Sequence, residues 1–276
     1  MMVLLDNNEF YKVLEPLKKV TINNLFARTV VEKHLPGKIY MDDVNAPTVF
    51  YIVHPYGMSL LFGNPDNDQF NRQFREYAFN SDQSRNRNEW MQVFPDDWDN
   101  KLKELFGSHL IKQSENITNE KDKVELNGRV NFKFNSDLYF VYKQNEHKDD
   151  FEIVRTDRQI FNSMKGTVVP MYFWKDAETF CTKGVGFSLF DNGRLASTAY
   201  SAYIHDNYLE IGIETVEEFR GKGLAQCACS ALIDYCLQNN FEPVWSCRLE
   251  NIGSCKLAKK LGFETVSIRT YYKLPY

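Results

Sequence analysis

A short loop with two glycines, placed between a strand-like and a helix-like segment, constrains this chain more than any other feature. Tyr208–Val216 is rich in β-branched and aliphatic residues and predicts a strand. Leu224–Leu237 has helical length and contains neither Gly nor Pro. The intervening loop places Gly221 and Gly223 directly before that helix. Backbone N–H groups at a helix start lack intrahelical partners and carry partial positive charge, so this arrangement predicts an anion site.

Spacing excludes two familiar nucleotide-binding loops. A Walker loop needs its lysine directly after the second glycine, whereas Lys222 lies between the two glycines here. A Rossmann fingerprint needs a third glycine at the position that Gln226 occupies. What remains is the pattern R-x-x-G-x-A, from Arg220 to Ala225.

That pattern resembles the pyrophosphate-binding motif of the GNAT superfamily of acyl-CoA-dependent N-acyltransferases. Asn251–Phe263 is likewise similar to the family's closing helix, N-x-x-A/S-x-x-L-Y-x-K-x-G-F. The resemblance covers about residues 151–276 and extends to a Gram-positive subgroup with a long N-terminal extension. One position departs from it, because Ala258 stands where many members carry a Tyr that acts as general acid. The proton donor is therefore left open among Tyr271, Tyr272, Cys247 and a water molecule.

We expect an α+β fold. The resemblance implies a C-terminal domain with a mixed central sheet and flanking helices, and the Asn-Gly turn at 192–193 agrees with a hairpin in it. The polar stretch 145–150 predicts a boundary between a domain of residues 1–145 and a GNAT-like domain of residues 146–276. The smaller α+β N-terminal domain would form a wall of the acceptor cleft.

The N-terminal half has its own predicted elements. Strands are expected at 38–41, 48–53 and 58–62, and the polar residues 80–96 predict a loop. The order of elements in 22–79 loosely parallels that of 185–237. This half is either a degenerate GNAT-like copy without the Arg-Gly-x-Gly loop or a coincidence of order, and the sequence leaves both open.

The resemblance implies acetyl-CoA as cosubstrate and indicates which residues bind it. The loop and helix start would hold the pyrophosphate, and the preceding strand would hydrogen-bond the pantetheine arm. That strand should diverge from the next one after Ser246, which leaves the N–H of Ile213 or Thr215 for the thioester carbonyl. Asn251 and Ser254 match positions that touch the cofactor or cap the last helix. The expected cofactor-binding residues are Ile213, Thr215, Val216, Arg220, Gly221, Lys222, Gly223, Leu224, Ala225, Asn251 and Ser254.

Acetyl transfer to an amine also needs a base, because an alkylammonium has a pKa of about 10. Glu210 and Glu214 share one face of the predicted strand, with Gly212 between them. Either carboxylate would act directly or through water, and we place Glu214 slightly ahead because it is nearer to the divergence. The alternative is an ordinary exposed strand glutamate or one paired with a lysine.

Composition excludes several other classes of function. The net charge of −4 argues against a nucleic-acid partner bound by bulk attraction. The six cysteines form no C-x-x-C pair and no nearby His pair, so we expect free thiols in a reducing cytoplasm and no metal. The chain has no apolar run of membrane-spanning length and no signal peptide, which predicts a soluble protein without a membrane partner.

The main hypothesis is therefore an N-acetyltransferase that moves an acetyl group from acetyl-CoA to a primary amine of a small molecule. The amine would attack directly in a ternary complex. One alternative is a catalytically weak CoA-binding regulatory or partner-binding protein, which Ala258 in place of Tyr supports. The other is a protein N-acetyltransferase. The acceptor, the acyl chain length and the oligomeric state, a homodimer included, stay open.

Overall fold

The computed structural model describes residues 1–112, 122–144 and 151–276. The chain forms two compact units, each assembled from segments that are distant in sequence. The boundary predicted at 145–150 lies outside the described residues. The N-terminal unit consists of Met1–Arg129, Arg248–Glu250 and Ile268–Tyr276, and the C-terminal unit of Val130–Cys247 and Asn251–Ser267.

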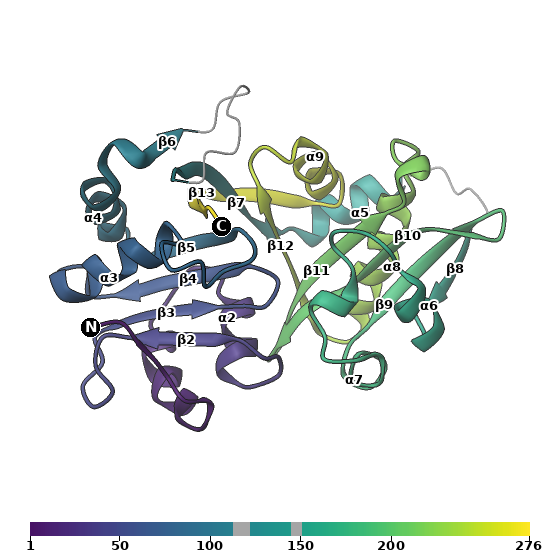
Figure 1. Ribbon diagram of the computed structural model, residues 1–276. Helices are drawn as coiled ribbons and strands as arrows, with labels where there is room; N and C mark the ends of the chain where they lie inside the picture. Colours follow the sequence, from purple (N-terminus) through teal and green to yellow (C-terminus); the bar gives the residue numbers. More distant parts are fainter. Residues whose placement is uncertain (113–121, 145–150) are drawn as a thin grey trace. The chain divides into compact units, whose positions relative to one another are not determined.

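The N-terminal unit is built on a sheet whose first four strands are antiparallel neighbours (Figure 1). These strands are β1 (Val3–Leu4), β2 (Lys38–Met41), β3 (Val49–Val53) and β4 (Met58–Gly63). Next to them, β5 (Glu89–Phe94) runs parallel to β4, and the end of β13 (Phe263–Leu274) pairs antiparallel with β5. The three strands predicted in this half are confirmed.

The loop predicted over residues 80–96 is wrong for β5. Its sequence looks polar because it contains Glu89 and Gln92, yet both side chains are buried. The Glu89 carboxyl accepts hydrogen bonds from the hydroxyls of Tyr51 and Tyr77, the latter at 2.6 Å. Burial raises the pKa of Glu89, and the tyrosines satisfy its oxygens. Residues 89–94 thus form a strand although their sequence has no clear alternating pattern, because residues distant in the chain provide hydrogen-bond partners for the buried Glu89.

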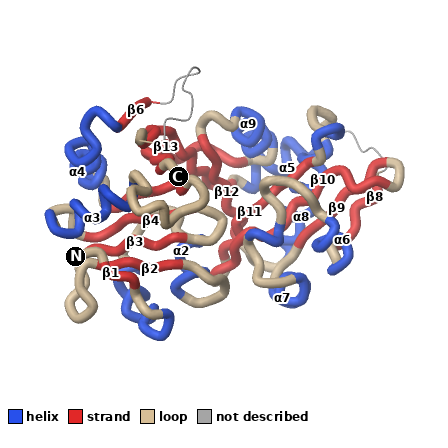
Figure 2. Tube along the Cα trace, viewed as in Figure 1, coloured by secondary structure: helices blue, strands red, loops and turns tan. Residues whose placement is uncertain are grey.

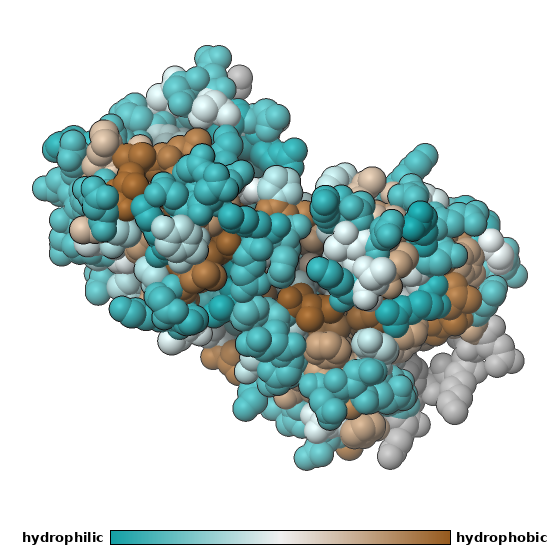
Figure 3. Space-filling model, turned by 90° about the horizontal axis from the view of Figure 1, so that it is seen from below, coloured by the Kyte–Doolittle hydropathy of each residue, from teal (hydrophilic) through white to brown (hydrophobic). Residues whose placement is uncertain are grey.

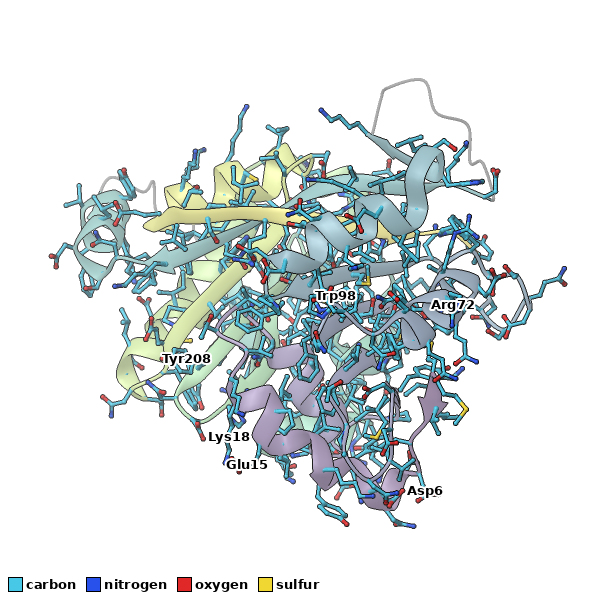
Figure 4. All side chains as sticks on the ribbon, turned by 90° about the vertical axis from the view of Figure 1, so that its left-hand side faces the viewer. Asp6, Glu15, Lys18, Arg72, Trp98 and Tyr208 are labelled. Atoms are coloured by element: carbon cyan, nitrogen blue, oxygen red, sulfur yellow. The ribbon has the colours of Figure 1, made fainter. Side chains whose placement is uncertain are left out.

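Helices cover this sheet with aromatic side chains. Phe70 and Phe74, four residues apart, point from one helix into the core, and Trp98 and Leu102 do so from another. Trp98 is fully buried, and its indole N–H donates to the carbonyl of Gly63 at 3.1 Å (Figure 4). The helices are η1 (Asn7–Val13), α1 (Leu14–Lys18), α2 (Leu25–Val31), α3 (Asp68–Ala78), α4 (Asp97–Phe106) and η2 (Gly107–His109).

Two further strands follow these helices. The short β6 (Leu110–Lys112) pairs in parallel with the beginning of β7 (Val124–Phe134). β7 and β13 each contribute residues to both compact units: Val130–Phe134 belongs to the C-terminal unit and Ile268–Tyr276 to the N-terminal unit. The chain therefore returns to the N-terminal unit at its end.

The C-terminal unit contains an antiparallel meander followed by a parallel strand (Figure 2). The turn at Asn192 and Gly193, both with positive φ, joins β9 (Gly186–Asp191) to β10 (Arg194–His205), as the Asn-Gly sequence predicts. The last strand runs parallel to its neighbour because a helix connects the two. The strands are β8 (Glu152–Arg155), β9 (Gly186–Asp191), β10 (Arg194–His205), β11 (Tyr208–Thr215) and β12 (Glu242–Arg248).

The helix that connects β11 to β12 is the centre of this unit's core. This helix, α8 (Leu224–Gln238), buries Ala228, Cys229, Leu232 and Ile233 against the sheet. Burial raises the pKa of the Cys229 and Cys236 thiols, the latter to about 12, and all six cysteines are free thiols. The other helices are α5 (Ser136–Gln144), α6 (Arg158–Ser163), η3 (Pro170–Tyr172), α7 (Ala177–Lys183), η4 (Glu217–Phe219) and α9 (Ile252–Lys260).

The two units share one order of elements. In each, three antiparallel strands (β2–β4 or β9–β11) precede a helix (α3 or α8), a strand parallel to the third (β5 or β12) and a second helix (α4 or α9). The parallel between the two halves expected from the sequence is therefore confirmed at the level of element order. The units differ in pairing, because β4 and β5 pair over five residues whereas β11 and β12 pair over three.

The face seen in Figure 3 is mostly hydrophilic, with apolar side chains showing between the polar ones. Within the described ranges, no helix combines the length and apolar character that a membrane span requires.

The buried Trp98 provides a test of this packing. Trp98→Ala should lower the free energy of unfolding by about 3–5 kcal/mol, because it leaves a cavity and removes the donor to Gly63. Tyr11→Ala, at a side chain that is 62% exposed, should change it by less than about 0.5 kcal/mol. Urea unfolding followed by circular dichroism measures both, and equal effects would contradict the described core.

Candidate active site

The connection from β11 to α8 is held in shape by one apolar side chain and two glycines. Phe219, which is buried, fixes the single turn η4 in the core. Gly221 and Gly223 adopt left-handed conformations, with φ of 79° and 82°. A Cβ atom at either glycine would meet nothing within 4 Å, so the surface of the loop is open at both.

Gly223 is also the N-cap of α8, and no described side chain caps this helix start. The N–H of Gln226 bonds to the Gly223 carbonyl, within the first turn itself. The first N–H groups of a helix have no intrahelical partner, and the positive end of the helix dipole lies there. The start of α8 at Gly221–Ala225 is therefore open and without a side-chain cap, which is the arrangement that the predicted anion site requires.

The two cations of the loop lie differently. The Lys222 ammonium lies over the Phe219 ring, 5.0 Å from its centre. The Arg220 guanidinium reaches back to the strand, where its Nε donates to the Thr215 carbonyl at 3.1 Å. Its Nη2 lies 3.4 Å from Oε1 of Glu214. The contact between Arg220 and Glu214 was not predicted from the sequence.

The backbone N–H groups of successive residues in β11 point alternately to the two edges of the strand. Val216, just after the strand, donates its N–H to the Ala196 carbonyl of β10 at 2.9 Å. With a period of two, Glu214 also points its N–H toward β10, and Ile213 and Thr215 point theirs to the other edge. These two donors are the ones that the resemblance predicted.

At that other edge, β12 pairs with β11 only at the beginning of both strands. The last registered pair is Glu210 with Val244, although β11 continues to Thr215 and β12 to Arg248. The predicted divergence is confirmed, but it begins before Ser246 rather than after it. Ile213 and Thr215 therefore lie beyond the end of the ladder, on the part of β11 that leads to the loop with Gly221 and Gly223.

Glu210 and Glu214 lie on the face of β11 turned away from α8, because the alternate residues Leu209 and Ile211 pack in the core with that helix. Both carboxylates are buried, at 5% and 8% exposure, so neither is the ordinary solvent-facing glutamate of the alternative interpretation. The Ser246 hydroxyl donates to Oε1 of Glu210 at 2.7 Å. This bond joins β11 to β12 where their ladder ends.

Glu214 is held by a segment far away in the sequence. Its Oε2 accepts the backbone N–H groups of Thr167 at 2.9 Å and Val168 at 2.8 Å. With Arg220 near Oε1, donors from two loops converge on this one carboxylate. Sequence reasoning found Glu214 but not these partners, because nothing local in 166–168 indicates them.

Tyr200 is a residue of this face that the sequence analysis missed. It pairs with Gly212 across β10 and β11, so its side chain points to the same face as the two glutamates. Its ring fills the space over Gly212: an added Cβ there would lie 2.5 Å from the Tyr200 ring. The room between Glu210 and Glu214 is thus taken by an aromatic side chain of the neighbouring strand.

The sequence profile of the GNAT acetyltransferase family matches residues 15–272, most of the chain. The protein belongs to the GNAT acetyltransferase family. An N-acetyltransferase of Bacillus subtilis (strain 168), YdfB, described as uncharacterized, is 27% identical over 252 residues, which cover 90% of this chain and 89% of the relative. The resemblance stated from the motifs is confirmed, and the protein is an acetyltransferase.

Solved structures agree with the fold of this GNAT acetyltransferase. A GCN5-related N-acetyltransferase-like protein from Streptococcus suis 89/1591 matches with a TM-score of 0.69 and 20% identity, over 97% of this chain and 99% of that one. A tandem GNAT protein from the clavulanic acid biosynthesis pathway matches with a TM-score of 0.61 and 9% identity, over 99% and 97%. At such identities the likeness is evidence for the fold alone, and the predicted fold class is confirmed.

Asn251 and Ser254 have structural partners in this GNAT domain. Asn251 is the N-cap of α9, and its side chain accepts the N–H of Ser254 at 3.1 Å. The Ser254 hydroxyl accepts the indole N–H of Trp245 at 3.1 Å. Of the two roles left open by the sequence, capping is the one these contacts support.

The candidate proton donors are dispersed. Tyr271 and Tyr272 belong to the N-terminal unit, where the Tyr272 hydroxyl donates to Asp99 at 2.6 Å. Burial and this carboxylate raise the pKa of Tyr272, so it holds its proton firmly. Cys247 is buried with its Sγ 3.4 Å from that of Cys255. Within the described part of the chain, no cluster of His, Cys, Asp and Glu side chains could hold a metal ion.

The contact between Gly212 and Tyr200 gives a prediction for the site. Gly212→Ala should destabilise the protein by about 1–3 kcal/mol and lower its activity, because the new methyl group overlaps the Tyr200 ring. Gly253→Ala is the matched control, since its methyl group has ordinary contacts in the first turn of α9 and should be neutral or stabilising. Thermal unfolding of both variants checks this, and a neutral Gly212→Ala would contradict the described packing.

Proposed function

We propose that this GNAT acetyltransferase moves an acetyl group from acetyl-CoA to a primary amine of a small molecule, by direct attack in a ternary complex. The observation that carries the proposal is the uncapped start of α8 beside the unpaired edge of β11. A pyrophosphate and a peptide-like arm need these two features side by side. The buried free thiols agree with a reducing compartment such as the cytoplasm.

The pyrophosphate of acetyl-CoA would accept hydrogen bonds from the main chain of Gly221–Ala225 at the positive end of α8. Lys222 and Arg220 carry the only charges within this loop that attract phosphates. The amide groups of the pantetheine arm would pair with β11 along the edge that β12 leaves, as an added strand would. In this placement the thioester lies near Ile213 and Thr215.

The reaction itself replaces a carbon–sulfur bond by a carbon–nitrogen bond. The amine nitrogen attacks the thioester carbon, and negative charge develops on the carbonyl oxygen, where the N–H of Ile213 or Thr215 stabilises it. The bond to sulfur then breaks, the coenzyme A thiolate leaves, and the nitrogen loses a proton. Because the products are an amide and a thiol, the thiolate takes up one proton.

A carboxylate would remove the proton from the incoming ammonium. Both Glu210 and Glu214 face the side of β11 that α8 does not cover, which suits an acceptor approaching from there. Glu210 lies where β11 and β12 separate, and Ser246 fixes one of its oxygens. This geometry favours Glu210 as the base.

The alternative of a CoA-binding protein without turnover has one structural observation in its favour. Ala258 is fully buried in the hydrophobic core of the C-terminal unit, so its position serves packing rather than proton transfer. During turnover, the leaving thiolate would take its proton from water or from the acceptor's own ammonium. Release of free thiol in the presence of an amine separates the two functions.

The cofactor proposal predicts a thermal shift that depends on the loop. Acetyl-CoA at a hundred times its dissociation constant should stabilise the native protein by about 2.7 kcal/mol, and Gly223→Glu should abolish this shift by placing a carboxylate at the anion site. Gly193→Glu is the matched control: its φ is 74° and its surroundings are open, but it lies in the β9–β10 turn.

Differential scanning fluorimetry with and without acetyl-CoA compares the three proteins. The wild type and Gly193→Glu should shift, and Gly223→Glu should not. A wild type that does not shift at millimolar acetyl-CoA would overturn the proposed cofactor. A wild type that shifts but releases no thiol with any of a panel of primary amines would favour the binding protein.

A further inference from the structure

We infer that Glu214 is a positioning residue, which fixes the turn Gly166–Val168 over β11 and links it to Arg220 of the cofactor loop. Glu214 then shapes the acceptor side of the site, and Glu210 alone acts as the base. This inference rests on the proposed function and assigns different tasks to the two glutamates of one strand face.

The contacts of Glu214 with the turn are strong and well directed. One oxygen, Oε2, accepts two backbone N–H groups, from Thr167 at 2.9 Å and Val168 at 2.8 Å. Hydrogen bonds to a carboxylate are roughly twice as strong as neutral ones, and a buried carboxylate is costly without them. The turn is joined to β11 by these bonds although 46 residues separate Val168 from Glu214.

Gly166 shows how closely the turn approaches the carboxylate. Its φ is 153°, and an added Cβ would lie 2.5 Å from Oε2 and 2.6 Å from the carboxyl carbon of Glu214. Any side chain at this position would push the turn away from β11. The close approach of the Glu214 carboxylate therefore requires a glycine at position 166.

The second oxygen of Glu214 connects the turn to the cofactor loop. Oε1 lies 3.4 Å from Nη2 of Arg220. The Nε of the same guanidinium donates a hydrogen bond to the Thr215 carbonyl. The Arg220 side chain is 61% exposed, so it stays within reach of a phosphate while its inner edge contacts the strand. Glu214 thus contacts both Arg220, which the proposed function places at the cofactor, and the turn Gly166–Val168, which lies on the acceptor side.

These contacts are also the reason why Glu214 is unsuited to be the base. Each carboxylate oxygen has two acceptor positions, and both positions of Oε2 are filled by main-chain donors. Oε2 can therefore take a proton from an amine only if the turn releases it, and the remaining position of Oε1 lies beside the Arg220 guanidinium. Glu210 accepts a hydrogen bond from the Ser246 side chain, and a side-chain hydroxyl can turn away when an acceptor arrives.

The experiment compares Glu214→Gln, Glu214→Ala and Glu210→Gln, using the amine that gives most thiol release in the panel. A glutamine at 214 keeps an oxygen that can accept both N–H groups of the turn, whereas alanine keeps none. We expect Glu214→Gln to retain kcat within about threefold, with the acidic limb of the pH profile unchanged. Glu214→Ala should raise KM for the amine about tenfold or more, and Glu210→Gln should lower kcat by about 10²–10⁴-fold and remove the acidic limb.

Gly166→Ala tests the same contact from its other side. It should reproduce the rise in KM of Glu214→Ala, because its methyl group overlaps the Glu214 carboxylate and displaces the turn, while both glutamates stay in the sequence. Gly193→Ala, another glycine of positive φ in the same unit, has open surroundings and should leave KM unchanged. Hydrogen exchange of the Thr167 and Val168 amides should be slow in the wild type and Glu214→Gln and fast in Glu214→Ala.

The outcomes separate this inference from the proposed function. If Glu214→Gln loses kcat as severely as Glu210→Gln, or loses the acidic limb, Glu214 is a base and the inference is overturned. If Gly166→Ala leaves KM unchanged, the turn has no part in acceptor binding and the inference is equally wrong. If the wild type releases no thiol at all, it is the proposed function that fails.

Discussion

The structure around the site depends on a helix that begins without a cap. The first N–H groups of α8 have no side-chain partner among the described residues, and two left-handed glycines keep the space in front of them open. Such donors are costly to leave unsatisfied unless water or a ligand meets them. The helix is nonetheless secure, because its other turns are buried against the sheet through small and apolar side chains. Core packing thus compensates for a helix start that has no side-chain cap.

The N-terminal unit shows what the same element order looks like without this feature. The helix α3 follows β4 as α8 follows β11, but Asn67 caps it by accepting the N–H of Phe70 at 3.0 Å. Its first turn carries Asp68, which occupies the positive end of the helix dipole. β4 and β5 remain paired as far as Phe62 and Phe94, so no edge opens between them. One order of elements therefore occurs twice, and of these two helix starts the one in the C-terminal unit is uncapped and lies beside a strand edge that its neighbour leaves.

Much of this could be predicted from the sequence, because the decisive features are local. The strand, the loop with Gly221 and Gly223, and the helix are consecutive, so an anion site can be predicted from their order, and the resemblance to the GNAT motif adds acetyl-CoA. What could not be predicted depends on partners far away in the chain. β5 looked like a loop because the partners of Glu89 are Tyr51 and Tyr77, which lie on other elements. The turn over Glu214 and the ring over Gly212 likewise come from other segments, and no local pattern indicates them.

The central claim is that the start of α8, and not that of α3, receives the cofactor. Hydrogen–deuterium exchange of the full chain, with and without millimolar acetyl-CoA, tests it most directly. The account predicts that exchange slows across Ile213–Ala225, where the main chain would meet the pantetheine arm and the pyrophosphate, and stays the same at Asp68–Asn71. Unchanged exchange in the loop, or equal protection at both helix starts, would contradict it.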